Sequence, residues 1–414
     1  MIIFMPEPYY EPEFAASSYL YDNIKEALTD QGYIIELYVP SPSRNISKEA
    51  RKTYRKIRYE EKHNGRLRIH RFTMYSEGKN TFLRSVRYFF CSIAHLWYGL
   101  TKNFDILYLG STPPITGVTG AIIKSFRRKP IVQVIQDVFP DSLLRVGLTE
   151  KDSIIWKIGR RLENISYRNA EIIIVISEEF KQNIINKGVP KDKIVVINNW
   201  VDENVVFPIK REDNPIFYDL GLDKDYFYVV YAGNLGNSQN IEIILDTAAE
   251  LIAFEKIRFI IFGSGTNEVK YTNMARELKL NNLQFFPLQP YEKVSQVYSL
   301  GDVSIVTCRA GCGGSAMPSK TWSVMAAGTA LIASFDEGSE LQLIIEKNAL
   351  GIFAKAGDQP ALKSCILKLY LDKKLCEELG KNGREFIMKN RTREIGTSKY
   401  VDVLKKIESQ FFAE

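Results

Sequence analysis

Histidine and cysteine, the residues that most often bind metals or cross-link chains, are scarce in this sequence. Its 414 residues include three histidines and five cysteines, and both types are dispersed. Cys308 and Cys312 could share a helix face, but no second Cys or His pair exists to complete a zinc site. Scattered cysteines in odd number also argue against a disulfide framework. We therefore expect a reduced, cytosolic chain without a metal or another cofactor.

Long apolar runs are absent as well. No stretch approaches the ~20 apolar residues that cross a bilayer, and residues 1–10 lack the basic and long apolar regions of a signal peptide. There is no Walker loop, no Gly-x-Ser-x-Gly elbow and no nucleic-acid-binding motif. The net charge of +6 would suit an anionic membrane surface or a phosphate-bearing substrate. We expect a cytoplasmic protein that could touch the inner face of the cell membrane.

Short β-branched runs alternate with helical patterns along the chain, which is typical of a parallel α/β architecture. A polar, aperiodic segment at 199–221 indicates a linker. We expect two doubly wound Rossmann-like domains that face a central cleft, at 1–205 and 206–394, and a helix at 395–414 that could cross back to the first domain. The expected strands are 1–5, 33–39, 67–72, 106–110, 131–136, 172–176, 194–197, 228–232, 257–262, 283–286, 303–306 and 330–334.

Two glycine-containing turns follow expected strands of the second domain. In Tyr231-Ala-Gly-Asn-Leu-Gly-Asn-Ser-Gln239, Gly233 and Gly236 would let the backbone approach a ligand. The helix that follows would offer unpaired N–H groups to a phosphate. Phe262-Gly-Ser-Gly-Thr266 could line the same cleft. For both segments, a simple glycine-permitted turn is the alternative.

The segment Arg309-Ala-Gly-Cys-Gly-Gly-Ser-Ala-Met-Pro-Ser-Lys320 carries more information. Pro318 suits the first turn of a helix, which would place Ser319 and Lys320 in that turn. The helix dipole opposes a lysine there unless an anion is also present, and a diphosphate would supply one. A capped surface helix with an exposed lysine is the alternative. We favour a phosphate site because the glycine loop, the helix start and the lysine agree.

Asp137 follows an expected buried strand of the first domain, in Val134-Ile-Gln-Asp-Val-Phe-Pro-Asp141. An acid at the carboxyl end of a strand could orient a hydroxyl, act as a base or counter developing positive charge. It could instead cap the next helix, although Asp141 is better placed for capping. We therefore take Asp137 as a candidate site residue.

Two segments could contact a membrane. Residues 82–102 contain an apolar stripe at helical spacing, with Arg84 and Arg87 beside it. Such a stripe more often packs on the protein's own sheet. Residues 124–129 form a basic cluster that could face the same anionic surface or be a solvated helix end. The stripe consists of Phe82, Val86, Phe89, Phe90, Ile93, Leu96, Trp97 and Leu100.

Together these segments resemble the family-four retaining glycosyltransferases of the two-Rossmann (GT-B) architecture, close to the enzymes of capsule, O-antigen and exopolysaccharide assembly. The resemblance covers nearly the whole chain, and the order and spacing of its motifs make it specific. The motifs are Tyr9-Tyr-Glu-Pro-Glu13, Ser111-Thr-Pro-Pro114, Gln136-Asp-Val-Phe-Pro-Asp141, Ile176-Ser-Glu-Glu179, Asn198-Asn-Trp-Val-Asp202, Gly233-Asn-Leu-Gly236 with Gln239, and Met317-Pro-Ser-Lys320 through Gly328.

The resemblance implies a division of labour between the domains. The second domain would bind a nucleotide diphosphate sugar, and the first would receive the acceptor, with the loop after Met5 and Asp137 facing the transferred sugar. Family members work without an essential metal and retain anomeric configuration. The catalytic candidates are Asp137 and Lys320. The substrate-binding candidates are Glu13, Gly233, Asn234, Gly236, Gln239, Arg309, Gly314, Ser315, Met317, Pro318 and Ser319.

The sequence departs from the family pattern in three places. Ser315 and Ser323 stand where relatives have two glutamates, of which the second grips the ribose. Asn234 replaces a frequent basic residue, which leaves Lys320 with Arg309 to neutralise the phosphates. Residues 15–16 are alanines instead of the usual glycine pair.

The expected activity is transfer of a hexosyl or N-acetylhexosaminyl group from a nucleotide sugar, UDP-linked by family frequency, with retention. The acceptor would be a lipid-linked or growing cell-surface glycan, with peripheral membrane contact through 82–102 and 124–129 and no nucleic-acid partner. One alternative is a non-catalytic subunit that binds nucleotide sugars or glycans, as the missing glutamates suggest. The other is a nucleotide-sugar epimerase, which would need acid/base carboxylates around the donor sugar.

Overall fold

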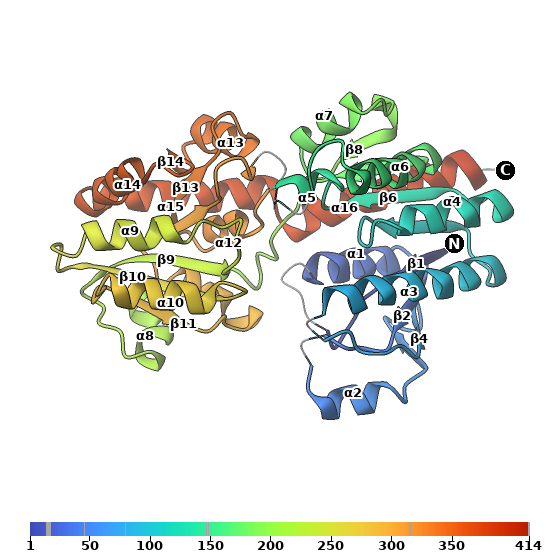
Figure 1. Ribbon diagram of the computed structural model, residues 1–414, viewed down its shortest axis with the longest axis horizontal. Coiled ribbons are helices and arrows are strands. Elements are labelled where there is room, and N and C mark those ends of the chain that lie inside the picture. The colour runs from blue at the N-terminus through green and yellow to red at the C-terminus, as the bar shows by residue number, and fades with distance from the viewer. Residues whose placement is uncertain are drawn as a thin grey trace. The chain divides into compact units, whose positions relative to one another are not determined.

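The chain folds into two compact α/β units (Figure 1). The computed structural model describes residues 1–13, 18–44, 46–78, 80–145, 147, 149–313 and 317–412. Unit 1 comprises Met1–Asn198 with Gly396–Glu414, and unit 2 comprises Asn199–Ile395. Each unit has its own sheet with helices on both faces, so the prediction of two doubly wound α/β domains is confirmed.

The described strands of unit 1 form one eight-stranded sheet, in the order β3-β4-β2-β1-β5-β6-β7-β8. Every neighbouring pair is parallel except β3 and β4. The chain first adds strands on one side of β1 and then continues on the other side with β5, so a topological switch point lies between β1 and β5. The bounds are β1 Ile2–Pro6, β2 Ile34–Pro40, β3 Tyr59–Lys62, β4 Leu67–Phe72, β5 Ile106–Gly110, β6 Ile131–Ile135, β7 Ile172–Val175 and β8 Ile194–Val196.

Several helices of unit 1 begin at capping residues. The side chains of Asn80, Ser153 and Ser177 accept hydrogen bonds from the first turns of α3, α6 and α7. The last helix, α16, packs on unit 1, where Tyr33 donates to Glu408 at 2.8 Å. The helices are α1 Ser18–Asp30, α2 Lys48–Tyr54, α3 Thr81–Thr101, α4 Thr116–Arg127, α5 Asp141–Arg145, α6 Ile154–Asn169, α7 Glu178–Asn186, η1 Lys191–Lys193 and α16 Arg393–Phe412.

The described strands of unit 2 form a parallel sheet in the order β11-β10-β9-β12-β13-β14, with its switch point between β9 and β12. Alternate side chains of β9 enter two cores on opposite faces: Tyr228 and Val230 in one, Val229 and Tyr231 in the other. The strands are β9 Phe227–Asn234, β10 Ile257–Ser264, β11 Leu283–Phe286, β12 Val303–Thr307, β13 Ala330–Phe335 and β14 Gly351–Lys355. The helices are η2 Arg211–Asp213, α8 Ile216–Asp219, α9 Glu242–Glu250, α10 Glu268–Glu277, η3 Tyr291–Lys293, α11 Val294–Tyr298, α12 Lys320–Ala326, α13 Glu340–Asn348, α14 Gln359–Leu371 and α15 Lys373–Asn390.

The twelve strands predicted from sequence are present, with ends shifted by at most two residues. Sequence patterns missed β3 and β14, which lie at sheet edges and are only partly buried. The segment 199–221, expected to be a linker, packs into unit 2, where Trp200, Val206 and Phe217 are buried.

The apolar stripe of α3 faces outward. Phe82 and Trp97 are 73% and 67% exposed, whereas Arg87, Cys91 and His95 form the buried face. The interpretation that this stripe packs on the sheet is therefore wrong. Arg87 is also no surface cation, because it is fully buried and its Nε lies 3.6 Å from a carboxylate oxygen of Glu77. Among the described residues, no helix is long and apolar enough to cross a membrane.

Candidate functional site

The carboxyl ends of β9 and β12 carry the donor-side candidates of unit 2. β9 ends in Gly233-Asn234, and Gly233 has a φ of +151°. A Cβ on Gly233 would lie 2.7 Å from Nζ of Lys320. Only glycine therefore lets the Lys320 ammonium lie against this strand end. The strand end lies at the switch point of the sheet, where ligands of α/β proteins bind.

Lys320 has no carboxylate within ion-pair distance among the described residues. Its Nζ donates to the hydroxyl of Tyr231 at 2.9 Å and lies 4.3 Å from the centroid of that ring. Burial disfavours the charged ammonium and lowers the pKa of Lys320 to about 8. An uncompensated, partly desolvated cation of this kind is suited to an anionic ligand.

Asn234, Gly236 and Gln239 form a tight turn after β9. Nδ2 of Asn234 lies 3.4 Å from Oε1 of Gln239, and a Cβ on Gly236 would come within 2.9 Å of both side chains. Gly265, from the glycine turn after β10, packs against this turn, because its Cβ would lie 2.7 Å from Oδ1 of Asn234. The structure thus brings the two glycine segments together beside Lys320.

Arg309 reaches the same turn from the end of β12. Its backbone N–H donates to the carbonyl of Ser238 at 2.8 Å. Its guanidinium lies 3.4 Å from Glu242, which also pairs with Lys270 at 2.7 Å. Arg309 therefore has a carboxylate partner, whereas Lys320 has none in the described part of the chain. Arg309 would contribute to an anion site with part of its charge already neutralised.

The glycine loop before α12 is fixed by Asp336, a residue that the sequence interpretation missed. Its two carboxylate oxygens accept the backbone N–H groups of Gly311 and Gly313 at 2.8 and 2.7 Å. Asp336 directly follows β13, so its place at a strand end was a usable signal. The candidates Gly314 and Ser315, like the alanines at 15–16, lie outside the described residues.

The start of α12 lies slightly later than the sequence predicted. Ser319 is the N-cap and Lys320 the first helical residue, whereas Pro318 precedes the helix. The Ser319 side chain makes no capping bond, and Met317 packs against the core of unit 2. The N–H groups of Thr321 and Trp322 already donate to the carbonyls of Pro318 and Ser319, at 3.0 and 3.1 Å. The ammonium of Lys320 is therefore the group at this helix end that is suited to an anion.

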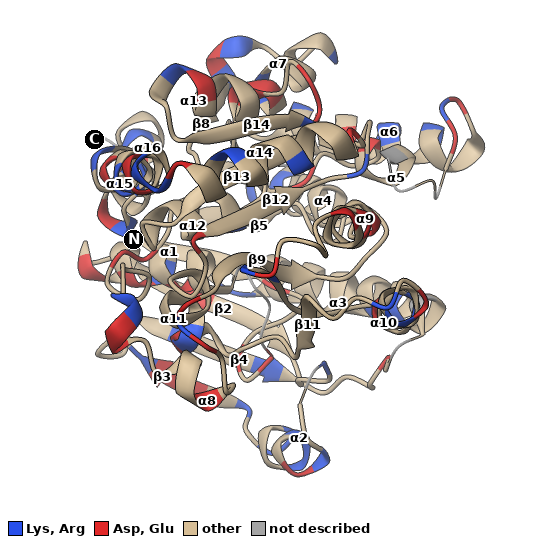
Figure 2. Ribbon diagram, turned by 90° about the vertical axis from the view of Figure 1, so that its left-hand side faces the viewer, with Lys and Arg blue, Asp and Glu red and all other residues tan. Residues whose placement is uncertain are grey.

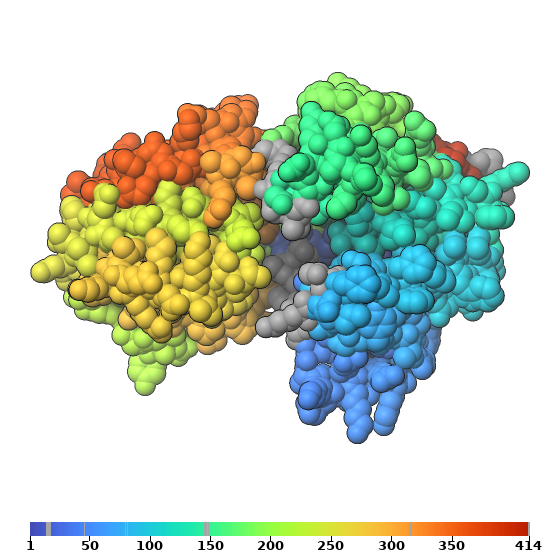
Figure 3. All heavy atoms as spheres, in the orientation of Figure 1, coloured from blue at the N-terminus to red at the C-terminus, as the bar shows by residue number. Residues whose placement is uncertain are grey.

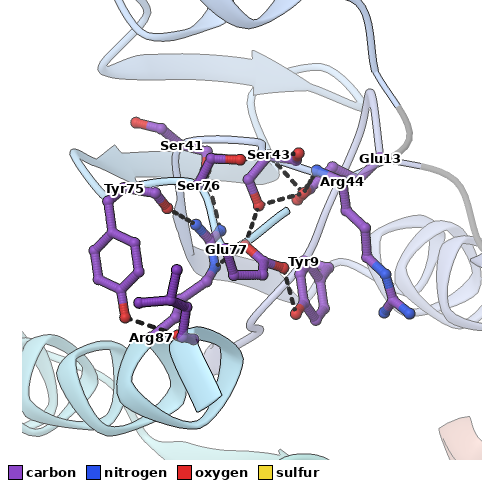
Figure 4. Close-up of polar contacts among 10 residues, drawn as sticks. Tyr9, Glu13, Ser41, Ser43, Arg44, Tyr75, Ser76, Glu77 and Arg87 are labelled. Carbon is purple, nitrogen blue, oxygen red and sulfur yellow. Dashed lines mark hydrogen bonds and ion pairs between the residues drawn. The ribbon is translucent and has the colours of Figure 1, made fainter. Parts of the chain in front are cut away.

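Glu13 of unit 1 belongs to a buried polar network (Figure 4). One of its carboxylate oxygens accepts the N–H groups of Ser43 and Arg44 at 2.6 and 2.7 Å. The Ser43 hydroxyl donates to Glu77 at 2.7 Å, and the Tyr9 hydroxyl donates to the same carboxylate at 3.0 Å. Burial raises the pKa of Glu13. Glu13 therefore anchors the loop after β2, which is a positioning role.

A pocket of about 320 Å³ opens beside this network at the switch point of the unit 1 sheet. It lies at the carboxyl ends of β1, β5 and β6, where ligands of α/β proteins bind. The family resemblance had pointed to the loop after Met5, which supplies part of the wall. Sequence reasoning did not find Arg44 or Tyr88, because they come from distant segments. The described lining is Met5, Pro6, Glu7, Pro8, Tyr9, Ser18, Tyr21, Arg44, Tyr88, Tyr108, Gly110, Thr112 and Gln136.

Asp137 lies next to this pocket. Its chain neighbour Gln136 lines the pocket, and Asp137 itself is exposed and lines a separate cavity of about 30 Å³. Gly110 lines both spaces. Asp141, four residues on, begins α5 and pairs with Lys187 at 2.8 Å, so it has a structural partner. Among the described residues, no group of three potential ligands could hold a metal ion.

Family comparisons match the two halves of the chain in turn. Residues 19–205 match the model described as Glycosyltransferase Family 4, and residues 213–386 match that described as Glycosyl transferases group 1. The probable glycosyltransferase WbjE of Pseudomonas aeruginosa is 28% identical over 313 residues, which cover 75% of this chain and 76% of WbjE. The putative colanic acid biosynthesis glycosyl transferase WcaI of Escherichia coli K12 is 26% identical over 215 residues, 51% of this chain and 53% of WcaI.

Solved structures resemble the whole chain. Sucrose-phosphate synthase from Thermosynechococcus elongatus gives a TM-score of 0.78 at 16% identity and covers 99% of both chains. Anabaena HepE, solved with UDP-glucose, gives a TM-score of 0.71 at 16% identity and covers 98% of this chain and 99% of HepE. At these identities the similarity establishes the shared fold.

Proposed function

This chain belongs to the GT-B glycosyltransferases built from a family 4 domain and a group 1 domain, and on that premise we propose that it transfers one sugar from a nucleoside diphosphate sugar to a lipid-linked or growing cell-surface glycan. We propose a UDP-linked hexosyl or N-acetylhexosaminyl donor and retention of configuration. The UDP-glucose bound to HepE supports the choice of donor, and the name of WcaI, which cites colanic acid biosynthesis, supports a cell-surface glycan as acceptor. Retention is proposed from the family resemblance.

One observation carries the proposal: the Lys320 ammonium, which has no carboxylate partner among the described residues, lies at a glycine-containing strand end and a helix start. When the donor reacts, negative charge develops on the leaving nucleoside diphosphate. The ammonium of Lys320, held by the Tyr231 hydroxyl at the start of α12, is a preorganised donor for that charge. Gly233 lets the Lys320 ammonium lie close to the backbone at this strand end. Gly236 does the same for the polar ends of Asn234 and Gln239.

Unit 1 would receive the acceptor. Its pocket lies at the switch point of the sheet, and Asp137 lies beside that pocket. We propose that Asp137 orients the acceptor hydroxyl or counters positive charge on the transferred sugar. Glu13 acts through the loop that it holds and does not itself need to touch substrate.

The test is a screen of UDP-, GDP- and ADP-sugars by thermal shift, followed by measurement of nucleoside diphosphate release. Release that depends on a polyprenyl-diphosphate-linked sugar supports the transferase. Interconversion of the donor sugar without acceptor would identify an epimerase. Donor binding without any turnover would identify a binding subunit.

We also propose that unit 1 contacts an anionic membrane through α3, α4 and α6. These helices lie side by side because Gly99 and Gly117 permit close approach: a Cβ on either would come within 2.3 Å of a residue on the neighbouring helix. Figure 3 shows the three as one continuous face of unit 1. Large apolar side chains are exposed on each of them, notably Trp97, Phe126 and Ile154, at 67%, 74% and 78%.

The charge of this face favours an anionic partner. Without the buried Arg87, α3, α4 and α6 carry one, two and four lysines or arginines, of which Lys124 pairs with Glu171 and Arg160 with Glu163. α3 and α4 contain no Asp or Glu, and the single acid of α6, Glu163, is buried and paired with Arg160. By contrast, α10 of unit 2 carries both acidic and basic residues (Figure 2). Two copies of such a face would repel each other. An anionic bilayer would instead attract its cations and bury its apolar side chains.

A further inference from the structure

We propose that the pocket of unit 1 binds an acceptor that carries an anionic group, a carboxylate or a phosphate, and that Arg44 pairs with this group. The inference rests on the proposed function, because it concerns the acceptor of the same transfer reaction.

The pocket has the size and surface of a saccharide site. Its volume of about 320 Å³ lies at the lower end of the range for small-molecule pockets. Four of its lining residues are tyrosines, Tyr9, Tyr21, Tyr88 and Tyr108. Tyrosine offers an apolar ring face and a polar hydroxyl, which match the C–H face and the hydroxyls of a sugar ring.

Arg44 is the cation of the described lining, and none of the described residues compensates its charge. Its side chain is exposed, and no described carboxylate lies within ion-pair distance of it. The acid of the lining, Glu7, already pairs with the buried Lys25 at 3.0 Å. A ligand that fills this pocket and excludes water would therefore leave Arg44 unpaired unless it brought its own negative charge.

The position of Arg44 is fixed from behind. Glu13 holds the backbone N–H groups of Ser43 and Arg44, and Glu77 links Ser43 to Tyr9. The guanidinium carbon of Arg44 lies 5.3 Å from the centroid of the Tyr9 ring, and its side chain runs away from the network beside that ring (Figure 4). Ring and cation are thus presented together, which reduces the ordering cost of binding.

Burial of the polar and charged side chains of this network costs free energy. The packing of the loop alone does not require such side chains there. The side chains of Glu77 and Arg87 are almost fully buried, and Oε2 of Glu13 is buried without a hydrogen-bond partner. Arg87 also donates to the carbonyls of Tyr75 and Ser41, at 2.6 and 3.1 Å, which pins the same loop. A buried polar network that fixes one loop beside a pocket points to a preorganised binding site.

The experiment compares the intact wild-type chain with Arg44→Gln, Arg44→Lys and Arg55→Gln. Arg55 is an exposed arginine at the end of α2 and serves as the matched control. The anionic probes are methyl glucuronide and geranyl diphosphate, with methyl glucoside and geraniol as neutral counterparts. Binding is measured by saturation-transfer NMR and calorimetry. All variants keep Lys320, so any probe that binds to unit 2 contributes equally to the binding measured for each variant. Differences in binding between the variants therefore report on Arg44.

We expect Arg44→Gln to weaken binding of an anionic probe about tenfold or more, Arg44→Lys to retain part of it, and Arg55→Gln to match wild type. Loss confined to the glucuronide assigns the anion to the sugar, and loss confined to geranyl diphosphate assigns it to the lipid carrier. Unchanged anionic binding in Arg44→Gln, or equal loss of the neutral probes, overturns the inference. Binding of UDP-sugars tells the two proposals apart. If Arg44→Gln still binds a UDP-sugar, the proposed function stands whatever the result for Arg44. If wild type itself binds no nucleotide sugar, the proposed function fails.

Discussion

The side-chain nitrogen of Lys320 lies 2.9 Å from the hydroxyl oxygen of Tyr231, 89 residues away in the sequence. The Tyr231 hydroxyl donates its own proton to the carbonyl of Asn234 at 2.8 Å, so it accepts a hydrogen bond from Lys320. Burial raises the pKa of Tyr231, which therefore stays neutral. Tyr231 thus holds the ammonium in place without neutralising it, and the charge remains available to a ligand.

Replacing Lys320 with alanine should reduce turnover ~10²-fold or more, because it removes charge stabilisation at the leaving diphosphate. The fold should survive, since no described ion pair is broken. Nucleoside diphosphate release and thermal melting measure the two effects. Lys270→Ala, which removes an exposed lysine paired with Glu242, is the control and should remain active. Near wild-type activity in folded Lys320→Ala would refute the assignment.

Binding of UDP should weaken as the pH rises above about 8. Burial lowers the pKa of Lys320 to about 8, and a bound diphosphate would raise it again, so binding at higher pH requires uptake of a proton. The affinity should be level below that pH and then fall by at most about tenfold per pH unit. Calorimetry from neutral pH to about pH 9.5 measures this, with Lys320→Arg as a variant that stays charged. A flat wild-type profile would count against a titrating Lys320.

The lowered pKa of Lys320 affects stability and UDP binding in opposite directions. As the pH rises, UDP binding should weaken, whereas the unliganded fold should gain stability. The folded pKa of about 8 lies below the 10.5 of an unfolded lysine, so the unfolded chain binds more protons between these values. The contribution of Lys320 to the free energy of unfolding should therefore rise with pH across this window. Chemical denaturation of wild type and Lys320→Met at several pH values checks the slope. If the difference in unfolding free energy between wild type and Lys320→Met did not change with pH, the prediction would be wrong.

Gly233→Ala should displace Lys320 and abolish most activity. The new Cβ would lie 2.7 Å from Nζ of Lys320, and the φ of +151° would add strain of about 1–3 kcal/mol. Gly357→Ala separates the two effects, because Gly357 also has a positive φ but nothing lies within 4 Å of its Cβ. We expect the control to lose stability and keep activity. Equal activity of the two variants would contradict close contact between Lys320 and the strand end.

Asp137→Asn should impair sugar transfer far more than nucleotide binding, because Asp137 belongs to unit 1, beside the proposed acceptor pocket. Calorimetry with UDP should give nearly the wild-type affinity, while acceptor-dependent release falls. Asp141→Asn serves as a contrast, because it breaks the ion pair with Lys187 and should therefore lower the melting temperature. A large loss of UDP affinity in Asp137→Asn would place this residue with the donor and reverse the assignment of the two domains.

The double variant Arg128→Glu with Arg161→Glu should lose binding to anionic vesicles. Both arginines are exposed, at the end of α4 and on α6, and each cation near an anionic surface contributes about 1 kcal/mol. Co-sedimentation with phosphatidylglycerol vesicles and its decrease with salt measure the effect. Lys405→Glu with Lys406→Glu makes the same charge change on α16 and should bind normally. Equal recovery with neutral and anionic vesicles would leave the face without a membrane role.

The sequence alone determined the strands, the doubly wound class and the glycine turns. These features follow from local rules: buried parallel strands are short apolar runs, and glycine marks places where the backbone turns or approaches closely. The same rules located Lys320 at a helix start, although the helix begins after Pro318. The edge strands β3 and β14 were missed because partial burial leaves no continuous apolar run.

Tertiary structure decided which side chains face water and which meet one another. The spacing of residues 82–102 indicated an amphipathic helix, but only packing showed that Arg87 is the buried residue and Trp97 the exposed one. The pairing of Lys320 with Tyr231, and the loop that presents Arg44, join segments many residues apart. Periodicity records where residues lie around one element, whereas burial and pairing depend on which other elements the fold brings against it.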